Sequence, residues 1–161
     1  MLGPILGPLI DNWSSIYTNH ALLRTTVGFA HVGGLMLGGG CAIAADLATI
    51  EAVREGPIGK NSQLHVLKRT HTIVVTGLTA LIISGLLLFA SDAETFLHSR
   101  VFWLKMALMA SLVINGLVML AGERRVKRGD AGAWRRLHTA AVSSLLLWFL
   151  TTLAGAALPN V

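Results

Sequence analysis

The sequence predicts an all-α integral membrane protein, an up-down bundle of four membrane-spanning helices with a short N-terminal interfacial helix. Hydrophobic residues make up 53% of the 161 residues and charged residues 13%, against roughly a quarter charged in an average soluble domain. Four segments stay apolar over about 20 residues, the length that crosses a bilayer. Lipid offers the backbone no hydrogen-bond partners, so these spans must be helices, and short connections make neighbouring helices antiparallel.

The N-terminal segment, residues 1–24, is too polar to span a membrane and is expected to lie along its surface. Its first residues, MLGPILGPLIDNW, have no basic stretch and carry two prolines, which is unlike a signal peptide. Ile10, Trp13, Ile16 and Tyr17 recur at helical spacing. We therefore expect an interfacial helix with Trp13 and Tyr17 at the level of the lipid headgroups.

The four-helix bundle is expected to occupy residues 25–158. The predicted spans are about 25–47, 70–90, 101–121 and 137–158. Most Lys and Arg residues fall in or beside the loops 48–69 and 122–136. The positive-inside rule then places both loops in the cytoplasm and both termini outside the inner membrane. The basic runs are interpreted as topology signals, with lipid headgroup binding as the alternative; the apolar spans leave no soluble face for nucleic acid.

Glycines are concentrated in the first span, in the stretch HVGGLMLGGG at residues 31–40. Gly34 and Gly38 form a small-xxx-small pair, and Gly77 and Gly85 repeat the pattern in the second span. Such pairs let neighbouring helix backbones approach closely. Tight helix packing is the first interpretation, and a smooth wall for a flat ligand such as a porphyrin or quinone is the alternative.

Three histidines lie in or at the spans, where an ionisable side chain is a functional candidate by default. His71 and His138 both begin spans that run in the same direction, so their rings are candidates for the two axial ligands of a haem b. Both follow basic residues, so interfacial histidines are the plainer interpretation. His31 is expected to make an interhelical hydrogen bond, with a haem site shared with His98 or His20 as the alternative.

Other polar side chains within the spans are expected to be structural. Asp46 lies at the inner end of the first span, about 22 Å along the axis from His31. Its candidate partners are Lys68, Arg69 and Arg136. Asn115 is buried deeply enough to need an interhelical partner, for which the candidates are Asp46, His71 and Ser143. Lys105 is expected to extend its amine to the membrane interface. The hydroxyls of Ser143, Ser144, Thr151 and Thr152 can bond to the preceding helical turn.

Four pieces of the sequence carry a family resemblance: HVGGLMLGGGCAIAADLATI, TGLTALIISGLLLFASDAETFL, FWLKMALMASLVINGLVML and SSLLLWFLTTLAG. Together they resemble uncharacterised bacterial four-span membrane proteins that are distantly similar to the CopD-like copper-resistance membrane domain. The resemblance implies that His31, Asp46, Lys105 and Asn115 are the residues of any shared function. It also suggests copper as a ligand, although copper paths favour clusters of Met and His, and the methionines here are scattered.

The chain departs from that group at two positions. Relatives often close the fourth span with glycine followed by arginine, whereas Gly155 is followed by Ala156. The group is not associated with a histidine at the position of His71. Haem ligation by His71 and His138 would therefore be an addition of this member.

Three functions remain open at the level of sequence. No nucleotide-binding loop, HExxH motif, paired carboxylates within a span or activated nucleophile is found, so we expect a non-catalytic accessory or structural subunit of a larger membrane complex. The first alternative is a b-type haem electron carrier with two histidine ligands. The second is a CopD-like permease for a metal ion or small solute.

Overall fold

The computed structural model describes residues 6–130 and 132–160, with side chains described at 7–56, 63, 70–130 and 132–159. All regular structure in these residues is helical. The elements are α1 (Leu6–Asn19), α2 (Ala21–Gly34), a π-helix η1 (Leu35–Gly39), α3 (Gly40–Glu55), α4 (Pro57–Ser91), α5 (Ala93–His98), α6 (Arg100–Lys127), α7 (Ala133–Ala157) and a 3-10 helix η2 (Leu158–Asn160).

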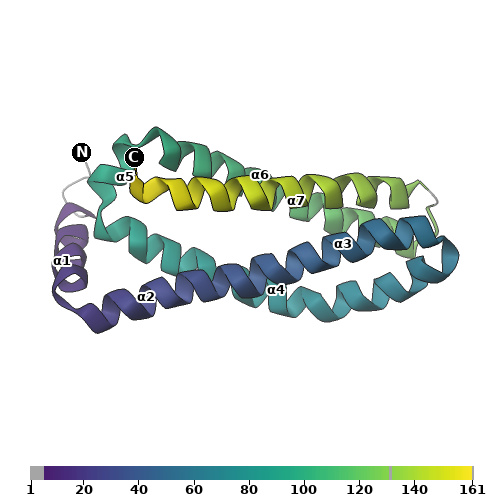
Figure 1. Cartoon of the computed structure of the whole chain (residues 1–161), viewed down its shortest axis with the longest axis horizontal. Helices are drawn as coiled ribbons and strands as arrows, with labels where there is room; N and C mark the ends of the chain where they lie inside the picture. The colour runs from purple at the N-terminus through teal and green to yellow at the C-terminus, as the bar shows by residue number, and fades with distance from the viewer. Residues whose placement is uncertain (1–5, 131, 161) are drawn as a thin grey trace.

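Four long helical rods form the bundle, because α2, η1 and α3 continue one another without a break. Each rod contains an apolar stretch long enough to cross a membrane, so the described residues contain four candidate spans. The rods run side by side, and α1 stands across the end of the bundle at which α7 finishes (Figure 1). The predicted helical bundle is confirmed, and the chain has the architecture of a multi-pass membrane protein.

The predicted loops are largely helical instead. The first rod continues to Glu55 and α4 begins at Pro57, so the expected loop 48–69 reduces to a turn at Gly56. Gly56 has a φ of +79°, which favours glycine, and proline suits the first position of the next helix. In the same way, α6 continues to Lys127 and the loop 122–136 shortens to a turn around Gly129, whose φ is +84°.

The first rod packs against α4 through glycines. A β-carbon built on Gly77 would lie 2.3 Å from the backbone nitrogen of Gly38, and one on Gly34 would lie 2.8 Å from the backbone nitrogen of Leu81. Side chains at these positions would collide with backbone. The two helices therefore touch backbone to backbone, as small-xxx-small pairs allow.

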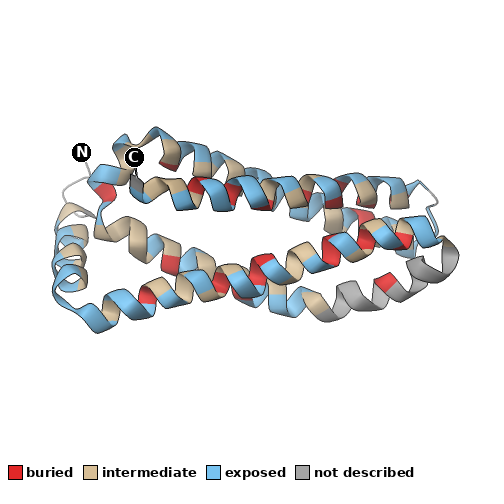
Figure 2. Ribbon diagram, in the orientation of Figure 1, coloured by how far each residue is buried: buried red, intermediate tan, exposed pale blue. Residues whose placement is uncertain are grey.

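The helix α7 forms the other main seam of the bundle, packing on α3 and on α6. The Trp148 ring lies against Gly39, and the Leu137 side chain fills the space above Gly122. Buried positions recur along α7 and along the first rod (Figure 2). Contact therefore runs from α4 through α3 and α7 to α6, whereas α4 and α6 barely touch each other among the described residues.

The N-terminal helix is tied to the end of α4. The Trp13 indole donates to the backbone oxygen of Leu87 at 2.9 Å, and the Ser14 hydroxyl donates to the backbone oxygen of Ser91 at 2.7 Å. Trp13 and Tyr17 pack with ring centroids 6.0 Å apart. The next helix begins at Ala21 rather than after residue 24.

Candidate functional site: a cleft between α4 and α6

A cleft of about 570 Å³ lies inside the bundle and is lined by all four rods. Most of its lining is apolar. Its edges include Val75 and Ile82 from α4 and Val113 and Leu117 from α6, and all four of these side chains are exposed. Because α4 and α6 do not pack together, the cleft opens sideways between them.

His31 and Lys105 occupy the end of the cleft nearest α1. The His31 Nδ1 atom lies 3.1 Å from the Ser84 hydroxyl, so the predicted interhelical hydrogen bond is confirmed. The Lys105 amine lies 3.4 Å from the place where a β-carbon on Gly155 would stand, and it is near enough to His31 to interact electrostatically. Lys105 therefore lines the cleft, where Gly155 leaves space for its side chain.

Asp46 lines the middle of the cleft and is only 2% exposed. Its carboxyl group lies beside the Ser144 hydroxyl, and its Oδ2 atom has no hydrogen-bond partner in the described part of the chain. The expected pairing with Arg136 is wrong, because that side chain lies in a separate groove. The other expected partners, Lys68 and Arg69, lie outside the described side chains.

Thr151 provides a second buried polar atom without a partner. Its hydroxyl oxygen makes no hydrogen bond within the described residues, although the side chain is only 8% exposed and lines the cleft. The predicted bond to the preceding helical turn is therefore not made. An unsatisfied buried polar group costs about 1–3 kcal/mol, so both Asp46 and Thr151 would be stabilised by a hydrogen-bonding ligand.

The opposite end of the cleft carries Thr70, His71 and Glu123. His71 is exposed and near enough to Glu123 to interact electrostatically. His138 is half-buried on α7 and is absent from the described cleft lining. His71 thus lines the cleft and His138 does not, and ligation of a haem by the two rings stays a prediction.

The other histidines with described side chains make hydrogen bonds elsewhere in the bundle. His31 contacts Ser84, thirteen residues or about 20 Å along α4 from His71. The rings of His20 and His98 each bond to a backbone oxygen of their own helical turn, those of Ile16 and Glu94. No group of three His, Cys, Asp or Glu side chains that could hold a metal ion occurs among the described residues.

The glycines divide into two kinds. Gly34, Gly38 and Gly77 are occupied by helix contacts, whereas a β-carbon on Gly116 would meet nothing within 4 Å. Gly116 lines the cleft, as does the Trp148 ring. Gly34, Gly38 and Gly77 therefore allow the first rod and α4 to pack closely, as the first interpretation predicts. Gly116 instead leaves open space in the wall of the cleft.

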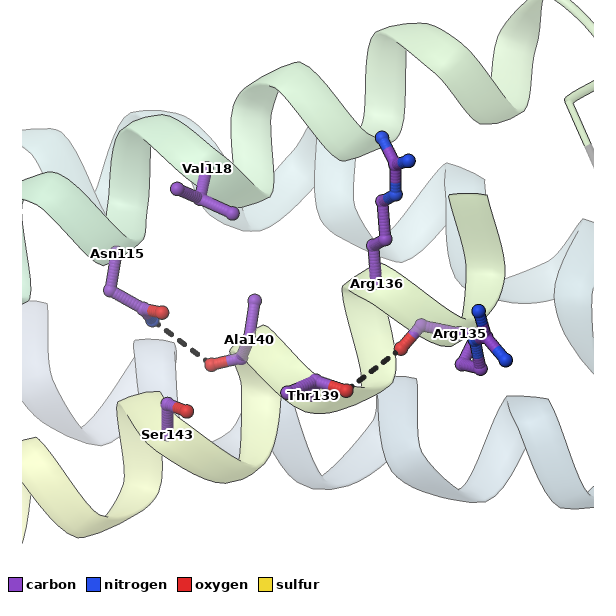
Figure 3. Close-up of a pocket in the computed structure, with 7 residues that line it drawn as sticks. All are labelled: Asn115, Val118, Arg135, Arg136, Thr139, Ala140 and Ser143. Carbon is purple, nitrogen blue, oxygen red and sulfur yellow. Dashed lines mark hydrogen bonds between the residues drawn. The ribbon is translucent and has the colours of Figure 1, made fainter. Parts of the chain in front are cut away.

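Asn115 lies in a different place from the other polar side chains. It donates to the backbone oxygen of Ala140 at 2.9 Å, so none of its expected side-chain partners is the one it uses. It lines a separate groove of about 320 Å³ between α6 and α7, together with Val118, Arg135, Arg136, Thr139, Ala140 and Ser143 (Figure 3). Of the four residues implied by the family resemblance, the cleft brings together His31, Asp46 and Lys105 but not Asn115.

The sequence analysis missed the contribution of α7 to the cleft. Ser144, Trp148, Thr151 and Gly155 all line it, and they are spaced by four, three and four residues, which places them on one helix face. This mixed stripe of two hydroxyls, one indole and one glycine on an otherwise apolar span is the signal that could have identified it. Chemically, the cleft offers hydrogen-bond donors and acceptors within a largely apolar wall.

No family model, curated protein or solved structure matches the chain. The resemblance to CopD-like proteins therefore stays a prediction.

Proposed function

We propose that the protein is a non-catalytic membrane subunit that binds a lipid-soluble quinone in the cleft between α4 and α6. The observation that carries the proposal is a pair of buried polar atoms, Asp46 Oδ2 and the Thr151 hydroxyl, that have no hydrogen-bond partner within the described residues and belong to the lining of this apolar cleft. Buried polar groups without partners are uncommon in native proteins. A ligand that bonds to both would remove their cost.

The size and position of the cleft suit such a ligand. Its volume of about 570 Å³ falls within the range of roughly 300–1,000 Å³ for small-molecule sites. The opening between α4 and α6 lies along the apolar side of the bundle. A molecule dissolved in the bilayer would therefore enter without passing through water, and its isoprenoid tail would remain against the exposed side chains of both helices.

The polar groups suit both redox forms of a quinone head. The oxidised ring accepts hydrogen bonds through its two carbonyl oxygens, for which the Thr151 hydroxyl and the Lys105 ammonium are donors. The reduced ring carries hydroxyl groups, for which the Asp46 carboxylate is an acceptor. Trp148 lies on α7 between Thr151 and Ser144, the neighbour of Asp46. Its ring packs on Gly39 and lines the cleft, so it would lie beside a bound head, and Gly116 leaves the α6 wall open.

The role of an accessory subunit follows from this chemistry. The cleft would hold a quinone through Asp46, Lys105 and Thr151, and electron exchange with it is left to another protein. A chain of this kind would hold or present the quinone to a redox partner in the same membrane. The positive-inside prediction gives the orientation, with the turns at Gly56 and Gly129 in the cytoplasm.

Quenching of Trp148 fluorescence tests the proposal directly, because quinones quench a nearby indole. The purified full chain in mild detergent is titrated with a short-chain ubiquinone analogue. We expect saturable quenching that Trp148→Phe removes, leaving only the weak linear quenching of Trp13, Trp103 and Trp134. Thr151→Val should raise Kd about tenfold, the equivalent of one hydrogen bond of about 1.4 kcal/mol.

The matched control uses the other lysine of α6. Lys105→Met should weaken quinone binding, whereas Lys127→Met removes the same charge from an exposed position outside the cleft and should leave Kd unchanged. Linear quenching with the same slope in the wild type and in Trp148→Phe would refute a quinone site in the cleft.

A further inference from the structure

We propose that the groove between α6 and α7 binds an anionic phospholipid, with Arg135 and Arg136 contacting its phosphate. This second site is independent of the quinone cleft. None of the residues that line the groove also lines the cleft. The two sites therefore lie on different faces of the α6–α7 pair.

The composition of the groove selects an anion. Its described lining contains two arginines and no acidic residue. Both arginines are exposed, and within the described part of the chain neither guanidinium has an ion-pair partner. In Figure 3 the Arg136 side chain extends from α7 toward α6, across the groove. Guanidinium groups bind phosphate through paired, charge-assisted hydrogen bonds, so an unpaired arginine pair at this position favours a phosphate group.

The cleft shows why the groove, rather than any basic part of the bundle, is the anion site. At the same end of the molecule the cleft carries the Glu123 carboxylate, which would repel a phosphate. The basic residues that end α6, Arg124, Arg125 and Lys127, do not line the groove. The two arginines of the groove itself would therefore select the anion.

The order of side chains along the groove matches the order of groups in a phospholipid. Arg135 and Arg136 lie in the first turn of α7, which begins at Ala133. Thr139 and Ser143 follow one and two turns along, so Ser143 is about 12 Å deeper than Arg135. The Ser143 hydroxyl can donate to an ester carbonyl of the lipid, whereas the Thr139 hydroxyl already donates to the backbone oxygen of Arg135 at 3.1 Å. One turn further, Leu146 is exposed and would contact the acyl chains.

A phospholipid fits this sequence of groups better than a soluble anion does. The groove has a charged end where the helices leave the predicted span and an apolar continuation along the span itself, including Val118 in the groove lining. Basic pockets between transmembrane helices are typical sites for anionic headgroups. The acyl chains would occupy the surface that the helices present to the bilayer.

Native mass spectrometry of the purified full chain tests this site. The protein is mixed with equal amounts of phosphatidylglycerol and phosphatidylcholine in detergent. We expect the chain to retain phosphatidylglycerol preferentially, and the double variant Arg135→Gln/Arg136→Gln to lose about tenfold in that preference, in line with the loss of a charge-assisted hydrogen bond.

The control variant Arg124→Gln/Arg125→Gln removes the same charge from exposed positions on the adjacent helix end, outside the groove lining, and should keep the preference. Equal loss in both double variants would overturn the site, because it would show a general response to net charge. Displacement of phosphatidylglycerol by inorganic phosphate alone would overturn a lipid as the ligand. Quenching of Trp148 by the quinone analogue should be unchanged in both variants, which separates this test from that of the cleft.

Discussion

The two sides of α4 meet their neighbours in opposite ways. On one side, Gly77 and Ser84 face the first rod, and the helix backbones touch. On the other side, Val75 and Ile82 border the cleft and are exposed toward α6. Both pairs are spaced by seven residues, so each pair lies along one face of α4. The stripe toward the first rod carries small side chains, and the stripe toward α6 carries larger, branched ones. Small residues allow a membrane helix to close against its partner, whereas the branched side chains of the other stripe border the cleft without packing on α6.

Gly77→Val has the largest expected effect, because it would force α4 away from the first rod. A β-carbon at residue 77 would lie 2.3 Å from the Gly38 nitrogen and 2.6 Å from its α-carbon, so the two helices must separate along the whole seam. We expect a loss of at least about 3 kcal/mol, the upper range for overpacking, measured as a lower melting temperature in detergent. A melting temperature equal to that of the wild type would show that the two helix backbones are not in contact.

Gly116→Leu should alter the open side without affecting the seam. A β-carbon at residue 116 meets nothing within 4 Å, so the larger side chain fills space in the cleft. We expect the melting temperature to stay the same or rise slightly, because leucine favours helix by about 0.8 kcal/mol over glycine. Saturable quenching of Trp148 by the quinone analogue should disappear. Retained quenching would place the quinone elsewhere.

Thr151→Val has the smallest overall effect expected of the three substitutions. It replaces a buried hydroxyl without a partner by a methyl group of the same shape, so we expect stability to rise by about 1 kcal/mol, while quinone binding weakens. Thr79→Val is the control, because the exposed Thr79 hydroxyl already donates to the backbone oxygen of Val75 at 2.9 Å. A drop in stability for Thr151→Val would mean that its hydroxyl has a partner.

Sequence patterns predicted the bundle because span length and apolar composition are local properties. They overestimated the loops because Gly56 with Pro57, and Gly129, each turn the chain within a few residues. Helix extensions beyond the bilayer are polar, and they resemble loops when hydropathy is the only guide.

The site was predictable only in part. His31, Asp46 and Lys105 stand out as ionisable groups on apolar spans, but their convergence on one cleft depends on how the rods cross. Asn115 shows most clearly that sequence patterns do not predict the hydrogen-bond partner of a polar side chain. Its depth suggested side-chain partners, yet the structure satisfies it with the backbone oxygen of Ala140, which sequence patterns do not distinguish from any other carbonyl. The stripe on α7 could have marked Thr151 as part of the cleft, but not the lack of a partner for its hydroxyl, because threonine hydroxyls in helices can bond to their own preceding turn.

The π-helix η1, at Leu35–Gly39, sets the rotational phase between the two halves of the first rod. A π-turn accommodates one more residue than an α-turn, and each residue of an α-helix advances the side chains by about 100°. His31 on one side of η1 and Asp46 on the other both reach the same cleft. Removing a single residue between them would rotate one half against the other by about that angle. We therefore expect substitutions of the exposed Met36 and Leu37 to be tolerated more readily than a deletion in this stretch, because the number of residues between His31 and Asp46 determines whether both face the cleft.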